Sequence, residues 1–316
     1  MLNRRKFLSA SALVAGSSLW TAPARASEAR LVFIHGRAQE GRKPDDVKAE
    51  WVGALKEGLA KNGKTLATTQ SIELPYYGDL LADFAKQAEI PLAADIKARG
   101  GPETDEFLQF QAEFADEIRV ERGITDQQVN AEYGDNPKER GPLNWEWVQA
   151  IVSAVDKHGG GLSSTALQQV TRDVFLYTNY PVVRDAVDKI VRAAIGTEPT
   201  VIIGHSLGSV VAYSVLQTDT RPLDVKLVTV GCPLAIRAIR RRFSPIKYPV
   251  RVKDWKNAFD TRDIVALYPL DKDNFNVTPA IENFGGIKNK TDNRHGISGY
   301  LDDAKVADWI ADDLGF

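Results

Sequence analysis

The chain has 316 residues, of which 43% are hydrophobic and 26% charged, with 24 glycines and 15 prolines. This composition is that of a globular protein with one large domain or two small ones, and it excludes disorder as the main state. A formal net charge of −2 gives no general electrostatic reason to expect a nucleic-acid partner. One cysteine, Cys232, and four histidines exclude an internal disulfide framework and a Cys/His zinc cage, which leaves oxygen nucleophiles and carboxylates as the expected chemistry.

Residues 1–26 have the pattern of an export signal. The pair Arg4 and Arg5 precedes a weakly apolar stretch and a small-x-small cleavage pattern at Ala24-Arg25-Ala26. The apolar stretch is too short and too rich in serine and glycine to span a bilayer, and the paired arginines are typical of a twin-arginine signal. We therefore expect the twin-arginine export machinery as a partner, a periplasmic or secreted location, and a mature domain of residues 27–316 without an integral membrane segment. A stably anchored tail is the alternative.

The mature sequence alternates between strand-like and helix-like segments. Strand-like runs of four to eight residues predict strands at 31–34, 201–204, 225–230 and 250–255, with a weaker candidate at 66–74, and unbroken Val/Ile/Leu runs suit strands that are buried on both faces. Apolar residues at helical spacing predict helices at 45–61, 182–195 and 207–216. This alternation predicts an α/β fold with a mostly parallel central sheet flanked by helices.

A long helical and polar segment, about 79–171, interrupts the alternation. Two apolar stripes run along it, one at Phe107, Phe110, Phe114 and Ile118 and the other at Trp147, Ile151 and Val155. An insertion of this size in an α/β frame is either a second small helical subdomain or a cap over a site, and we favour the cap.

The segment Thr200–Ala212 places a Gly-x-Ser-x-Gly pattern, with Ser206 at its centre, between an apolar strand and an apolar helix. A nucleophile elbow requires this context, because a tight turn projects the serine oxygen and the glycines leave room for neighbouring backbone. Ser206 is then expected at a helix N-terminus, where N–H groups and the helix dipole favour negative charge on a substrate. The alternative is a glycine turn with a buried capping serine.

At these residues the sequence resembles the α/β-hydrolase superfamily, in particular its serine esterases and lipases. The resemblance covers most of residues 31–314 as an order of elements, although only a few short stretches carry it residue by residue. It implies an α/β-hydrolase fold in which a serine, an acid and a histidine follow one another along the chain. The insertion departs from many relatives because it precedes the strand that leads to Ser206, so what is known of their lids does not transfer.

In the superfamily order, the catalytic acid and the histidine both lie C-terminal to the serine. Only His295 of the four histidines follows it, in a loop that resembles the family's catalytic-histidine loop, where an imidazole can take the serine proton and return it to the leaving group. In the turn beyond the strand expected at 250–255, Asp260 and Asp263 both qualify as the acid that orients the imidazole. The family often has Asp-x-Val there, which matches Asp263-Ile264-Val265, so Asp263 is preferred, while Asp260 can instead cap the turn.

The resemblance also implies two backbone donors for an oxyanion. One is Leu207, which follows the nucleophile, and the other is Arg37, because His35-Gly36-Arg37 resembles the His-Gly oxyanion loop of lipases. The alternative at Gly36 is a plain glycine turn that ends a strand. We expect the Arg37 side chain to be solvated and the His205 ring to point away from the reacting centre.

Together these patterns predict an exported serine hydrolase that cleaves the carboxylic ester of a small molecule or lipid through an acyl-enzyme. Ser206 attacks, His295 carries the proton, Asp263 orients the imidazole, and the N–H groups of Leu207 and Arg37 hold the oxyanion, with no metal or cofactor. Thioester cleavage or acyl transfer with the same triad is the alternative among enzymes. A binding protein that keeps the hydrolase frame without turnover is the alternative from another class.

Overall fold

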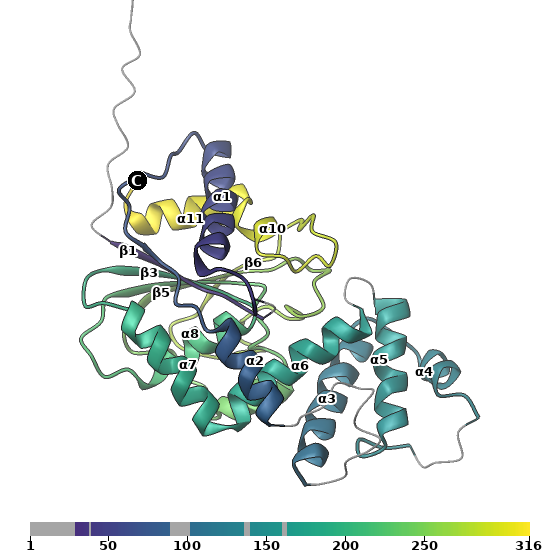
Figure 1. Cartoon of the computed structure of the whole chain (residues 1–316). Helices are drawn as coiled ribbons and strands as arrows, with labels where there is room; N and C mark the ends of the chain where they lie inside the picture. The colour runs from purple at the N-terminus through teal and green to yellow at the C-terminus, as the bar shows by residue number, and fades with distance from the viewer. Residues whose placement is uncertain (1–28, 38, 89–101, 136–139, 160–162) are drawn as a thin grey trace, which may run out of the picture.

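A computed structural model of the chain describes residues 29–37, 39–88, 102–135, 140–159 and 163–316 (Figure 1). The expected export segment, residues 1–26, lies outside the described residues. Six strands form one sheet in the order β2-β1-β3-β4-β5-β6, and all of their pairings are parallel. The strands are β1 (Arg30–Ile34), β2 (Ile72–Glu73), β3 (Thr200–His205), β4 (Val225–Val230), β5 (Val252–Ala258) and β6 (Glu282–Phe284).

The sheet separates two apolar cores. Successive strand residues point to opposite faces, so Leu31 and Phe33 of β1 enter one core while Val32 and Ile34 enter the other. Both faces are covered, and for this reason β1 and β3 consist mostly of apolar residues, while β4 is buried along most of its length although Lys226 and Thr229 interrupt its apolar sequence.

Three helices cover the first face of the sheet (Figure 1). They are α1 (Pro44–Lys61), α10 (Ser298–Leu301) and α11 (Ala304–Leu314). Helix α1 begins with a proline, whose fixed φ suits the first helical position, and it ends with Lys61, whose positive charge suits the C-terminal end of the helix dipole. Its Trp51 and Leu55 are buried toward the sheet. Asp303 caps α11 by accepting hydrogen bonds from the first backbone N–H groups of that helix.

The second face carries more helical structure. Helices α2 (Gly78–Gln87), α7 (Pro181–Ala194) and α8 (Leu207–Thr218) pack on it, and the short α9 (Arg237–Arg240) follows β4. Beyond one end of this layer lie α3 (Pro102–Glu121), α4 (Asp126–Tyr133) and α5 (Trp145–Gly159), while α6 (Ser164–Asn179) leads back to the sheet (Figure 1). Phe107, Phe110 and Phe114 of the predicted stripe are buried in a core that is continuous with the one on the sheet. The helices between β2 and β3 therefore share the apolar core of this sheet face.

The strand predictions were wrong in three places. The strand predicted at 250–255 starts at Val252 and continues to Ala258, because Val250 lies in a turn with 90% of its surface exposed. The weaker candidate at 66–74 contains only β2. The edge strand β6 was not predicted, because its sequence Glu-Asn-Phe has no apolar run, and pairing with β5 holds it in place. Among the described residues, no helix is both long enough and apolar enough to cross a membrane.

Candidate active site

Ser206 lies at the sharp turn between β3 and α8. Its backbone has φ 55° and ψ −127°, a conformation that costs energy in a residue with a Cβ atom. The turn needs small neighbours, because a Cβ atom at Gly208 would lie 2.0 Å from the Ile34 carbonyl oxygen. A Cβ atom at Gly204 would likewise lie 2.9 Å from the Cα atom of Ser209. The two glycines of the motif thus allow α8 to start directly against β1, with Ser206 at the C-terminal end of β3.

The His295 imidazole bridges the Ser206 hydroxyl and the Asp263 carboxylate. Its Nε2 lies 2.8 Å from Ser206 Oγ, and its Nδ1 lies 2.7 Å from Asp263 Oδ2. The three residues are buried, with exposed fractions of 2% for Ser206, 0% for Asp263 and 6% for His295. They follow β3, β5 and β6, whose C-terminal ends meet at one edge of the parallel sheet. With the Nδ1 proton held by the carboxylate, Nε2 can accept the hydroxyl proton of the serine.

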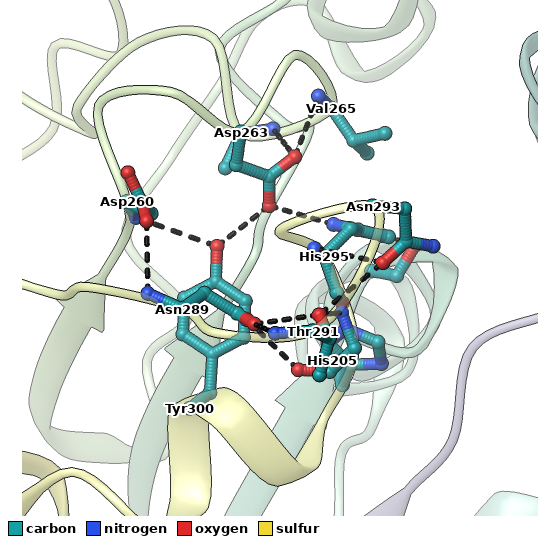
Figure 2. Close-up of polar contacts among 12 residues, drawn as sticks. His205, Asp260, Asp263, Val265, Asn289, Thr291, Asn293, His295 and Tyr300 are labelled. Atoms are coloured by element: carbon teal, nitrogen blue, oxygen red, sulfur yellow. Dashed lines mark hydrogen bonds and ion pairs between the residues drawn. The ribbon is translucent and has the colours of Figure 1, made fainter. Parts of the chain in front are cut away.

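A polar loop between β6 and α10 holds His295 (Figure 2). The backbone N–H of His295 donates to Asn293 Oδ1 over 3.0 Å, and Asn289 Nδ2 donates to the Gly296 carbonyl over 2.9 Å. The Thr291 hydroxyl donates to Asn289 Oδ1 over 2.6 Å and accepts the Gly296 N–H over 2.9 Å. The loop is therefore cross-linked on both sides of the imidazole.

The two candidate acids have different partners. Asp263 directs Oδ2 to His295, while its Oδ1 accepts the backbone N–H of Val265 over 2.8 Å. Asp260 accepts the backbone N–H of Arg262 over 2.8 Å and forms an ion pair with the guanidinium of the same residue at 3.0 Å. The structure thus places Asp263, and not Asp260, against the imidazole, whereas Asp260 stabilises its own turn.

Two further buried histidines lie near Ser206, and both are neutral. Burial lowers the pKa of His35 to about 4, and burial together with the nearby His295 ring lowers the pKa of His205 to about 3. His205 Nε2 donates to the His295 carbonyl over 2.7 Å, so its ring contacts the main chain of the loop. His35 Nε2 accepts the backbone N–H of Tyr77 over 3.1 Å, and its Nδ1 therefore carries the proton and donates to the Gly36 carbonyl over 2.7 Å.

These histidines predict a fold that acid destabilises. The ordinary pKa of 6.5 applies to His35 in the unfolded chain, whereas the folded value is about 4. Between about pH 6.5 and 4 the unfolded chain binds a proton that the folded chain excludes, so the free energy of unfolding falls as pH falls, by about 1.4 kcal/mol per pH unit for a fully depressed histidine. His35→Gln is expected to remove the share of this slope that His35 contributes.

Urea unfolding between about pH 7 and pH 5 measures this share. The difference in unfolding free energy between wild type and His35→Gln should shrink as the pH falls. His158→Gln is the matched control for the substitution itself, because His158 is an exposed histidine on α5. A constant difference for His35→Gln would contradict the assignment of a neutral His35.

The end of β1 lies against the serine. A Cβ atom at Gly36 would lie 2.9 Å from the Ser206 Cβ atom, and the Tyr77 hydroxyl holds this stretch by donating to the His35 carbonyl. Within the described part of the chain, neither the backbone N–H of Arg37 nor that of Leu207 donates a hydrogen bond to the protein.

The Arg37 side chain is packed rather than solvated, contrary to the prediction. It is 17% exposed, and its Nε lies 3.7 Å from Asp173 Oδ2 on α6. The guanidinium also donates to the side-chain oxygen of Gln169, while Asp173 is paired with Arg172 at 3.1 Å. Burial lowers the pKa of Arg37 and raises the pKa of Asp173, and their opposite charges partly offset this cost. The sequence prediction was wrong because α6 covers the end of β1.

The described residues also limit which other chemistry is available. In this part of the chain, no group of three or more His, Cys, Asp or Glu side chains is arranged to hold a metal ion. Cys232 is buried after β4, and burial raises the pKa of its thiol to about 12. A thiolate nucleophile is therefore not present near neutral pH.

Sequence reasoning missed the tyrosines that surround the site. The Tyr300 hydroxyl donates to Asp263 Oδ2 over 2.6 Å. Tyr77 donates its hydroxyl proton to the His35 carbonyl and its backbone N–H to the His35 ring. Nothing in the local sequence marks either residue, because each bond joins segments that are distant along the chain. The Asn/Thr-rich run before His295 was a usable signal, since such side chains commonly bond to loop backbone.

The chain was compared with models of protein families, with curated proteins and with solved structures, and none of them matches it. The chemistry of the site must therefore be argued from its own geometry.

Proposed function

We propose that this chain is an exported serine hydrolase of the α/β-hydrolase type that cleaves carboxylic esters through an acyl-enzyme. The observation that carries the proposal is the imidazole of His295, held 2.8 Å from Ser206 Oγ and 2.7 Å from Asp263 Oδ2. The strand ends that carry these groups form the edge at which open α/β sheets bind their ligands. Their order along the chain, serine then acid then histidine, agrees with that of the superfamily.

The proposed reaction begins with attack of Ser206 Oγ on the acyl carbon. The hydroxyl proton passes to His295 Nε2, the carbonyl oxygen becomes an oxyanion, and the Asp263 carboxylate stabilises the resulting imidazolium. The N–H groups of Leu207 and Arg37 donate to the oxyanion. Collapse of this intermediate expels the alcohol, which takes the proton from Nε2, and leaves the acyl group on the serine. Water then attacks the acyl-enzyme by the same steps and releases the acid.

The helices between β2 and β3 are proposed to form a cap beside this site. The contacts of Arg37 with Gln169 and Asp173 support this, because they bring α6 against the turn that carries one proposed oxyanion donor. With the export signal expected over residues 1–26, the proposed place of action is the periplasm or the medium.

Labelling with a fluorophosphonate tests the proposal, because this reagent phosphonylates a serine only where a neighbouring base activates it. Folded wild type is expected to be labelled at Ser206, as located by peptide mass spectrometry, and denatured protein is expected to remain unlabelled. A panel of p-nitrophenyl esters and thioesters then reports the leaving group. A folded protein that is not labelled and that cleaves neither class would overturn the proposal in favour of a binding protein.

A further inference from the structure

Tyr300 lies on α10, directly after the loop that carries His295, and its hydroxyl points toward Asp263 (Figure 2). Its ring is fully buried, and its hydroxyl lies 2.6 Å from Asp263 Oδ2. The same carboxylate oxygen lies 2.7 Å from His295 Nδ1. One oxygen of Asp263 thus accepts hydrogen bonds from both the phenol and the imidazole.

The phenol acts as a donor in this arrangement. The backbone N–H of Asp260 donates to the Tyr300 oxygen over 3.4 Å, so the Tyr300 O–H is directed to the carboxylate. Burial raises the pKa of Tyr300 well above its ordinary value, and the charge of Asp263 raises it further. The hydroxyl therefore keeps its proton throughout the neutral pH range.

We propose that Tyr300 is a positioning residue that limits how strongly Asp263 attracts the proton of His295, and so keeps the imidazole available as a base near neutral pH. This inference rests on the proposed function. A carboxylate that accepts an additional strong hydrogen bond is a weaker base, and it stabilises a neighbouring imidazolium less than the same carboxylate without that bond. The phenol also fixes the plane in which Oδ2 meets Nδ1.

The other charged and titratable groups near the triad do not compensate for the hydrogen bond from Tyr300 to Asp263. Among the described residues, the other titratable or charged groups near the imidazole and the Asp263 carboxylate include His205, with the neutral His35 beyond it, and the pair Asp260 and Arg262. His205 is neutral, because burial lowers its pKa to about 3. The charge of Asp260 is paired with Arg262 at 3.0 Å. The other Asp263 oxygen, Oδ1, accepts the backbone N–H groups of Val265 and Ala266 over 2.8 and 3.4 Å, so within the described part of the chain the Tyr300 hydroxyl is the side-chain donor that shares Oδ2 with the imidazole.

The test is the pH dependence of kcat/KM for a p-nitrophenyl ester in Tyr300→Phe, which removes the hydroxyl and keeps the ring. The acidic limb of the profile is the low-pH range in which kcat/KM falls as the pH falls. It is expected to move to higher pH by about 0.5 to 1 unit, while kcat in the pH-independent range, the plateau, changes by less than about tenfold. Tyr177→Phe is a matched control, because Tyr177 on α6 donates to the Asp188 carboxylate over 2.6 Å, away from the triad. Its acidic limb should coincide with that of wild type.

A purely structural role for Tyr300 would lower the thermal midpoint or the plateau kcat and leave the limb in place, and this result would overturn the inference. Should Tyr300→Phe fail to fold, 3-fluorotyrosine at position 300 supplies a stronger donor and is expected to move the limb to lower pH. An unmoved limb would again overturn the inference.

Failure of the inference can be told apart from failure of the proposed function. If wild type turns over through Ser206 and the limb does not move, the inference alone is wrong. If Ser206 proves unreactive in wild type, the proposed function is wrong. NMR titration of the His295 ring protons in Ser206→Ala, with and without Tyr300→Phe, then still tests the effect of the phenol, and equal titration midpoints would overturn it.

Discussion

Ser206→Ala is expected to lower kcat/KM for ester cleavage by about 10⁵-fold. Without Oγ there is no covalent intermediate, and only the proposed oxyanion donors remain to assist direct attack by water. Steady-state kinetics on the best ester of the panel measures the loss. The side chain at this position contributes little to the core, so the thermal unfolding midpoint should change by only a few degrees.

Ser214→Ala is the matched control, because Ser214 is also a buried serine and lies further along α8. Its kcat/KM should stay within about tenfold of wild type, since loss of one neutral hydrogen bond away from the site has a modest effect. If Ser206→Ala were as active as Ser214→Ala, the assignment of the nucleophile would be wrong.

Asp263→Asn is expected to lower kcat by about 10⁴-fold near neutral pH. An amide in place of the carboxylate presents an N–H to His295 and favours the tautomer with its proton on Nε2, which then cannot accept the proton of Ser206. The amide also leaves the imidazolium of the transition state without a counter-charge. Stopped-flow or steady-state kinetics on an activated ester measures the effect.

Asp260→Asn separates the role of the acid from that of the turn. Asp260 accepts the backbone N–H groups of Arg262 and Asn289, each over 2.8 Å, so its neutralisation should lower the free energy of unfolding by about 2 kcal/mol. Its activity at a temperature where it is folded should stay within about tenfold of wild type. If Asp260→Asn lost more activity than Asp263→Asn, the two assignments would have to be exchanged.

The parts of the fold that were predicted correctly are those where one local pattern is sufficient. Strand β4 was predicted with its observed bounds, and α8 was predicted to start at Leu207, because buried strands and helices leave continuous or periodic apolar runs. The end of β5 was missed because Lys256 and Asn257 are polar although they are buried. Each has a long-range partner, Asp313 at 2.6 Å and Asn283 at 2.9 Å, that no local pattern reveals.

Some residues of the candidate site are likewise marked by the sequence, whereas others are not. Ser206 could be proposed from a motif in its strand-helix context, whereas His295 and the choice of Asp263 over Asp260 also needed the resemblance to the superfamily, and the structure brings all three residues together. The contacts of Tyr300 with Asp263 and of Arg37 with α6 could not be proposed, because each depends on how two distant segments pack.

The residues proposed for catalysis and the helices α3, α4 and α5 come from separate parts of the sequence. Every group proposed to handle a proton follows residue 200, whereas helices α3, α4 and α5 come from residues before 160. In the proposed cap arrangement, substitutions within those helices can therefore alter the surroundings of Ser206 while the residues proposed for its chemistry stay unchanged. The buried apolar residues of these helices belong to the same core as one sheet face, so excision would expose an apolar surface to water. Replacement by a segment of matching shape is therefore better than deletion.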